Sequence, residues 1–217
     1  TGAKSPPVLD VGCGQGTLGR AITEMGYTVW GVECVPQAIA KARDRVARLI
    51  DSDLQDIARV KAGLAGELVD YIVFSDVLEH VYDPHGILRD YAQFLKPGGM
   101  VLVSVPNIAN WQARLRLFCG QFYYEPSGIM DRTHIRFFTN KTAALLCSYK
   151  GLYNSMDSLL GVALQTRASF LLLISEAEQS AEKIAKSVER GRHSVALLNV
   201  ARIPYYEIKS DSDMPMI

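Results

Sequence analysis

The chain has 217 residues, 48% of them hydrophobic, and its 23 Lys and Arg residues balance 23 Asp and Glu residues. This length and composition suit one globular domain over residues 1–217 with a sizeable buried core. The formal net charge of zero argues against nucleic acid as the main partner, because binding to phosphates needs clustered Lys and Arg.

Apolar runs and helical spacing alternate along the first half of the chain. In chain order, the sequence predicts a strand at 8–11, a helix at 17–25, a strand at 28–32, a helix at 37–49 after Pro36, a strand at 68–74, a helix at 84–95, a turn at 96–99 and a strand at 100–105. Residues 46–50 at the end of the helix predicted at 37–49 could instead form the third strand of the sheet, which would then end near Asp53.

The pattern is less regular after Pro106. The sequence predicts a helix at 108–118, an irregular segment at 120–136, a helix at 139–150 capped by Thr139 or Asn140, a helix at 169–190, and an antiparallel edge pair at 158–164 and 195–201. The apolar start of the helix at 169–190 leaves three roles open: a lid, a dimer face, or a helix that covers the sheet.

Strands that alternate with helices predict an α/β fold of the Rossmann-like, doubly wound kind. We expect a mostly parallel, seven-stranded sheet with helices on both faces and one antiparallel edge strand. The strands are nearly continuous apolar runs, as in parallel sheets that are buried on both faces. We divide the domain into a cofactor-binding half, 6–106, and an acceptor-side half, 107–217.

The turn after the first strand carries the clearest binding signal. Gly12, Gly14 and Gly16 have G-x-G-x-G spacing rather than the G-x-G-x-x-G of dinucleotide sites, and glycines permit close approach of a ligand. Asp10 would repel a pyrophosphate but attract a cationic ligand such as S-adenosylmethionine, which carries a sulfonium and an ammonium group. Glu33 lies 23 residues further on, where such folds hold a ribose diol.

Further cofactor contacts are expected at the ends of the neighbouring strands. Asp53 is placed to accept a hydrogen bond from the adenine amine and Leu54 to pack on the ring, although Asp53 equally fits a plain helix cap or loop residue. Cys34, directly after Glu33, and Ser75, after the fourth strand, complete the predicted cofactor-binding set.

Several short motifs resemble those of class I methyltransferases. LDVGCGQG at 9–16, GVE at 31–33 and FSDVLEHV at 74–81 are similar to successive motifs of that family, and LKPGG at 95–99 resembles the turn before its fifth strand. Their order and spacing match over 6–106. The resemblance implies S-adenosylmethionine as cofactor and methyl transfer as the activity. The segment 107–151 is similar to a bacterial subgroup that often accompanies glycan or lipopolysaccharide genes.

Asp76, Glu79 and His80 follow the fourth strand, at the edge where open α/β sheets bind ligands. With His134 they resemble the E-x-x-E-H metal motif of ubiquinone-pathway O-methyltransferases and that of small-RNA 2′-O-methyltransferases, with Asp76 in place of the first Glu. One hypothesis is a divalent metal held by these four residues. A second is metal-free chemistry, with His80 or His134 as general base oriented by Asp76 or Glu79. A third is that Glu79 and His80 only cap the following helix.

The leading functional hypothesis is O-methylation of a hydroxyl on a small molecule or a glycan. The alternatives are a metal-assisted RNA 2′-O-methyltransferase, against which the neutral charge argues, and a non-catalytic S-adenosylmethionine-binding module. Arg132 and Arg136 fit an acceptor phosphate or carboxylate, or surface salt bridges. The aromatic side chains fit stacking on the acceptor, or packing in a core or lid: Trp111, Tyr123 and Tyr124.

The four cysteines show no C-x-x-C pair and no zinc-ligand spacing. We therefore expect reduced thiols and a cytoplasmic location. The apolar stretches are too short to span a bilayer, and we expect no signal peptide. Association into a homodimer remains open.

Overall fold

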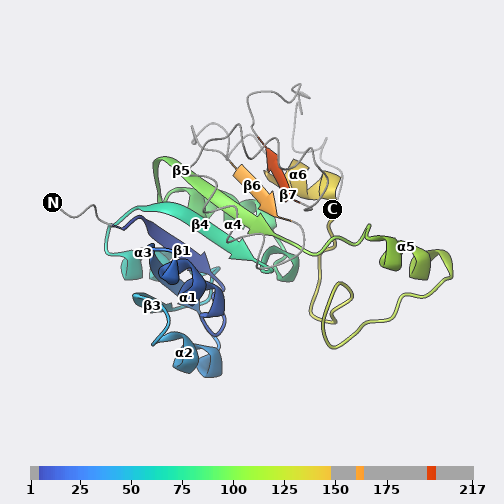
Figure 1. Cartoon of the computed structure of the whole chain (residues 1–217), viewed down its shortest axis with the longest axis horizontal. Coiled ribbons are helices and arrows are strands. Elements are labelled where there is room, and N and C mark those ends of the chain that lie inside the picture. Colours follow the sequence, from blue (N-terminus) through green and yellow to red (C-terminus); the bar gives the residue numbers. More distant parts are fainter. Residues whose placement is uncertain (1–4, 148–159, 164–194, 199–217) are drawn as a thin grey trace.

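A computed structural model describes residues 5–147, 160–163 and 195–198 of the chain (Figure 1). The predicted helix at 169–190 lies outside the described residues. The elements of the first half are β1 (Pro7–Val11), α1 (Thr17–Glu24), β2 (Thr28–Glu33), α2 (Pro36–Ala42), β3 (Arg48–Asp51), α3 (Ile57–Leu64), β4 (Val69–Ser75), a 3-10 turn (Leu78–His80), α4 (Pro84–Ala92) and β5 (Leu95–Ser104). They are followed by α5 (Trp111–Phe118), α6 (Asn140–Cys147), β6 (Leu160–Ala163) and β7 (Val195–Leu198).

One sheet runs through the centre of the molecule in the order β3-β2-β1-β4-β5-β6-β7. The strands from β3 to β5 are parallel to their neighbours. The short strand β6 pairs parallel to β5, and β7 pairs antiparallel to β6. The predicted α/β class is confirmed, with a five-stranded parallel sheet from β3 to β5.

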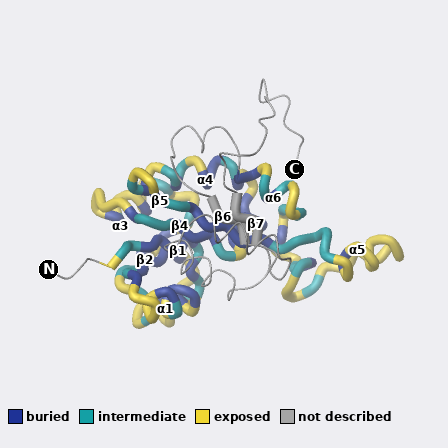
Figure 2. Tube along the Cα trace, turned by 45° about the horizontal axis from the view of Figure 1, so that its top comes forward, coloured by how far each residue is buried: buried dark blue, intermediate teal, exposed yellow. Residues whose placement is uncertain are grey.

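The centre of the sheet is the hydrophobic core, as the apolar strand sequences predict. Val8, Leu9 and Val11 of β1 and Phe74 of β4 have no exposed surface. Tyr91 of α4 packs edge-on against Phe74, with ring centroids 5.3 Å apart. Figure 2 shows these buried strands in the middle of the molecule, and the parallel pairing of β1 with β4, with Val11 opposite Phe74, brings their carboxyl ends together.

In the first half of the chain, two elements have other bounds than the sequence predicts and one helix was not predicted. The helix predicted at 37–49 ends at Ala42, and the alternative strand is correct, because β3 spans Arg48–Asp51. Helix α3 was not predicted, although Asp56 caps it by accepting a hydrogen bond from Arg59 N at 3.0 Å. The predicted turn at 96–99 belongs to β5, whose register with β4 shifts there.

Residues 107–138 form an arm that leaves the sheet after β5, carries α5 and returns to α6 (Figure 1). The base of the arm is closed by Ile108 N, which donates to the carbonyl of Phe138 at 2.8 Å. Trp111, Tyr123 and Tyr124 on this arm are exposed, so they do not pack into the described core. None of the described helices has the length and apolar character needed to cross a membrane.

Candidate functional site

The turn between β1 and α1 contains three residues in the left-handed region. Gly12, Gly14 and Gly16 have φ angles of 67°, 54° and 73°, which strain residues that carry a side chain. A Cβ added to Gly12 would lie 2.8 Å from Cγ2 of Val77, whereas one added to Gly14 would meet nothing within 4 Å. The turn is therefore packed against the loop after β4 at Gly12 and open to an approaching ligand at Gly14.

The carboxylate of Glu33 joins the end of β2 to this turn. Its Oε2 accepts a hydrogen bond from Gly14 N at 2.8 Å. Its Oε1 accepts from Cys34 N at 2.9 Å and from Val35 N at 2.8 Å. Glu33 thus lies at the glycine turn, where the sequence predicted it, while its contact with a ribose diol stays a prediction.

Asp10 lies on β1 beneath the turn, opposite Gly31 of β2, and is buried. A Cβ added to Gly19 would lie 3.6 Å from Asp10 Oδ2, so this carboxylate faces the start of α1. Burial, with further contributions from Asp10 and Glu33, raises the pKa of Cys13 to about 12. Two acidic groups therefore surround the turn, and that charge suits a cationic ligand.

Asp53 and Leu54 follow β3 at the same edge of the sheet. Asp53 is exposed and its Oδ1 accepts from Gln55 N at 2.8 Å. The carbonyl of Leu54 accepts from the hydroxyl of Tyr91 at 2.9 Å, and burial, followed by Asp53, holds the pKa of Tyr91 above its usual range. Burial and neighbouring carboxylates, Asp53 among them, also raise the pKa of Cys34. The predicted adenine-contacting residues thus lie near the end of β2.

Asp76 occupies a strained position directly after β4. Its φ angle is 55°, a value that residues with side chains rarely adopt. Its amide donates to the carbonyl of Ser104 at 3.0 Å, and Ser104 Oγ donates to Asp76 Oδ1 at 2.9 Å. Ser104, buried at the end of β5 and paired with Ser75, therefore aims the Asp76 side chain. Sequence reasoning missed Ser104.

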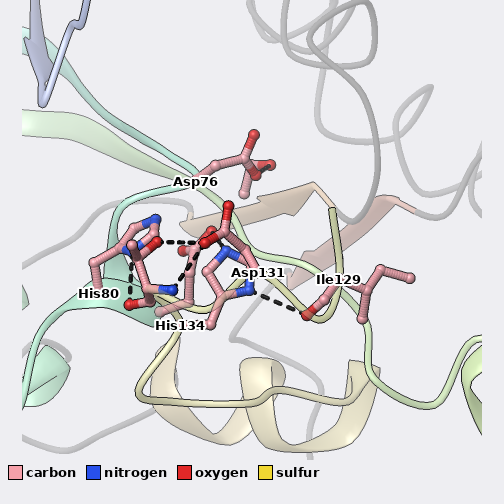
Figure 3. A network of polar contacts seen from close by, with 8 residues as sticks. Asp76, His80, Ile129, Asp131 and His134 are labelled. Carbon is pink, nitrogen blue, oxygen red and sulfur yellow. Dashed lines mark hydrogen bonds and ion pairs between the residues drawn. The ribbon is translucent and has the colours of Figure 1, made fainter. Parts of the chain in front are cut away.

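Three predicted residues converge beside Asp76. Glu79, His80 and His134 each present a ligand atom, and these atoms lie within 4.8 Å of one another. Figure 3 shows the two histidines side by side. The two imidazole rings meet edge to face, with centroids 4.9 Å apart. We call Glu79, His80 and His134 the Glu-His-His cluster. Asp76 lies next to it but outside this group of ligand atoms.

Hydrogen bonds to the backbone fix which nitrogen of each imidazole is free. His80 Nδ1 lies 3.1 Å from the carbonyl oxygen of Thr133, and His134 Nδ1 lies 3.1 Å from that of Ile129. A carbonyl oxygen can only accept, so both Nδ1 atoms carry the proton. The neutral imidazoles therefore keep a lone pair on Nε2, the state in which histidine binds a metal or takes up a proton.

Glu79 is buried in an unusual electrostatic environment. Neither of its carboxylate oxygens has a hydrogen-bond partner among the described residues, and Oε1 lies 3.8 Å from His134 Nε2. Burial is the main cause that raises the pKa of Glu79 to about 8, and Asp76 and Asp131 add to it. A buried carboxylate without donors is costly unless a cation or a proton compensates it.

The two arginines near His134 have different surroundings. Arg136 donates through Nη2 to the carbonyl of Tyr82 at 2.6 Å, and its amide donates to the carbonyl of Glu79 at 3.0 Å. Arg132 is exposed. Arg136 thus ties the arm to the loop after β4, while binding of an acceptor by either arginine stays a prediction.

Comparison with known proteins gives one family and one fold. The model of a family described as a methyltransferase domain matches residues 1–154. The chain is 35% identical over 108 residues to a ubiquinone biosynthesis O-methyltransferase of Xanthomonas axonopodis pv. citri. The match covers 46% of this chain and 43% of that protein. The chain thus spans less than half the length of the curated relatives it matches.

Solved structures share the fold at low sequence identity. A SAM-dependent methyltransferase from Archaeoglobus fulgidus aligns with a TM-score of 0.51 and 20% identity, over 65% of this chain and 58% of that one. One from Thermotoga maritima aligns with a TM-score of 0.50 and 17% identity, over 70% and 64%. At these identities the likeness concerns the fold alone.

Proposed function

The chain belongs to the methyltransferase domain family, and from this premise we propose that it transfers the methyl group of S-adenosylmethionine to a hydroxyl of a small molecule or a glycan. The observation that carries the proposal is the contact between two neighbouring strand ends. The glycine turn after β1 packs on Val77, and the Glu-His-His cluster begins two residues later. A cofactor at the turn and an acceptor at the cluster would therefore be adjacent.

The chemistry needs a base as well as positioning. The acceptor oxygen attacks the methyl carbon in line with the breaking carbon–sulfur bond, and sulfur leaves with the electron pair as a neutral thioether. The hydroxyl proton must go to a base. His80 Nε2 and His134 Nε2 are suited to accept it, because their other nitrogens are already protonated. Glu79 Oε1 lies 3.8 Å from His134 Nε2, the nitrogen that would take up the proton.

A divalent cation is the alternative aid, and the residues fit one. Glu79 would supply a carboxylate oxygen, and His80 and His134 would each supply Nε2. Within the part of the chain that the structure describes, neither carboxylate oxygen of Glu79 has a hydrogen-bond partner, and this observation supports the fit. When bound, the cation would lower the pKa of the acceptor hydroxyl. Asp76, which pairs with Ser104, is not needed as a ligand in this proposal.

The proposal also covers the number of strands in the sheet and the location of the protein in the cell. We take β6 and β7 to complete the seven-stranded sheet of the family, with β7 as its antiparallel edge. We place the protein in the cytoplasm, which the four free cysteines support. No observation favours an RNA acceptor or a non-catalytic module.

Calorimetry with S-adenosylhomocysteine tests the cofactor site, using Gly14→Ala and Gly98→Ala as a matched pair. Both glycines have positive φ and open space where Cβ would lie, so each substitution costs about 1 kcal/mol of strain. We expect Gly14→Ala to weaken binding at least tenfold and Gly98→Ala to leave it unchanged. Equal affinity in the two variants would refute the assignment of the turn.

Incubation with methyl-labelled S-adenosylmethionine and a panel of hydroxylated acceptors then tests the reaction. We expect transfer to at least one acceptor hydroxyl, and loss of more than a hundredfold in rate in His134→Ala, which removes a base. Transfer only to nitrogen or carbon acceptors would contradict the proposed class. Addition of a chelator distinguishes the two routes, because only the metal-assisted route loses activity.

A further inference from the structure

A short turn on the returning arm holds both imidazoles of the Glu-His-His cluster (Figure 3). The amide of His134 donates to the carbonyl of Asp131 at 3.0 Å. The carbonyl of Thr133, between them, is the acceptor for His80 Nδ1 at 3.1 Å. The turn thus carries His134 itself. Its Thr133 carbonyl accepts a hydrogen bond from His80, which comes from the loop after β4.

The carboxylate of Asp131 fixes this turn. Its Oδ1 accepts from Thr133 N at 2.8 Å and from Thr133 Oγ1 at 2.7 Å. These two hydrogen bonds are the main cause that holds the pKa of Asp131 below its usual range, and the nearby His134 and His80 lower it further. At neutral pH the carboxylate is therefore ionised and can accept both hydrogen bonds from Thr133. It is not itself among the clustered ligand atoms.

We propose that Asp131 is a positioning residue for the reaction: by anchoring Thr133, it directs the Thr133 carbonyl to His80 Nδ1 and so keeps His80 Nε2 free and turned toward the cluster. The inference rests on the proposed function, since it concerns the same cluster. Indirect support of this kind is usual for functional histidines, whose second nitrogen is commonly held by a carbonyl or carboxylate. Neither the sequence of the arm nor the motif after β4 indicates by itself that the Thr133 carbonyl contacts His80.

Long-range ¹H–¹⁵N NMR of the imidazoles tests the inference directly. The chain has four histidines, so His80 and His134 are assigned by single His→Gln variants. In the parent we expect both neutral imidazoles to carry the proton on Nδ1, because a backbone carbonyl accepts from each. In Asp131→Ala we expect His80 to shift toward the Nε2–H form. In Asp131→Asn the amide oxygen accepts the same two hydrogen bonds, so we expect the parent pattern to return.

Asp56→Ala is the matched control. It removes a carboxylate that also accepts a backbone N–H, from Arg59 at the start of α3, and it should leave the imidazole signals unchanged. The inference is overturned if Asp131→Ala keeps the parent form of His80, or if Asp131→Asn shifts His80 as far as Asp131→Ala does. The measurement uses neither cofactor nor acceptor. Failure of methyl transfer would therefore refute the proposed function without changing this result.

Discussion

At the scale of single residues, the site is defined by charges placed where water is excluded. Glu33 satisfies its charge with three backbone donors, whereas Glu79 has none among the described residues. This contrast explains why one carboxylate organises a turn and the other is available to a proton or a cation. Their difference follows from position relative to backbone N–H groups, because both are buried.

Glu79 makes stability depend on pH. Its pKa is about 8 in the folded protein and 4.5 ordinarily, so between these values the unfolded state releases a proton that the folded state keeps. The stability contribution of the neutral form is full below pH 4.5 and is lost as pH rises through 8. In the presence of a chelator, we expect the unfolding free energy of the parent to fall relative to that of Glu79→Gln over this range, by about 5 kcal/mol at most.

Urea titrations at pH 5 and pH 8.5 check this prediction. Glu79→Gln keeps the shape of the side chain and cannot ionise, so its own unfolding provides the reference. A stability difference between the two proteins that is the same at both pH values would contradict the raised pKa.

At the scale of elements, caps and bridges decide where the chain turns. Helix α3 begins at a capping aspartate, and its buried residues Val60 and Leu64 recur at helical spacing. The arm is closed by one backbone bridge, Ile108 to Phe138, which returns His134 to the strand ends. The cap joins residues close in the sequence and could have been recognised there, whereas the bridge joins residues far apart in the chain and could not.

Loss of the α3 cap is expected to cost a moderate amount of stability. Asp56→Ala leaves the amide of Arg59 without its side-chain acceptor, so the unfolding free energy should fall by about 1 kcal/mol. Asp56→Asn, which retains an acceptor oxygen, should recover most of the loss. Thermal unfolding followed by circular dichroism measures both, and equal destabilisation by Ala and Asn would exclude capping as the cause.

At the scale of the whole molecule, buried contacts connect α4 to the cofactor side of the sheet. Tyr91 has no exposed surface, packs on Phe74 of β4 and donates its hydroxyl to Leu54. It therefore links the core beneath the sheet to the loop that is predicted to hold the adenine.

Tyr91→Phe isolates that hydroxyl. The ring remains, but the carbonyl of Leu54 loses its partner, so we expect a loss of about 1–2 kcal/mol of stability. We also expect weaker S-adenosylhomocysteine binding, because the loop with Asp53 is less firmly held. Tyr82→Phe, at a site 77% exposed, is the control and should change neither quantity. Unchanged calorimetric affinity in Tyr91→Phe would contradict the link between the loop and the cofactor.

The sequence by itself determined the parallel α/β sheet, the glycine turn with Asp10 and Glu33, and the approach of Glu79 and His80 to the same edge. These features depend on local spacing, and the carboxyl ends of parallel strands meet by geometry alone. The tertiary structure alone decided that His134 returns to this edge, that Thr133 and Ile129 set the protons on the two imidazoles, and that Ser104 binds Asp76. The contacts of His80 with Thr133 and of Ser104 with Asp76 join residues far apart in the chain, and no local pattern records which distant atoms will meet once the sheet and the arm have packed.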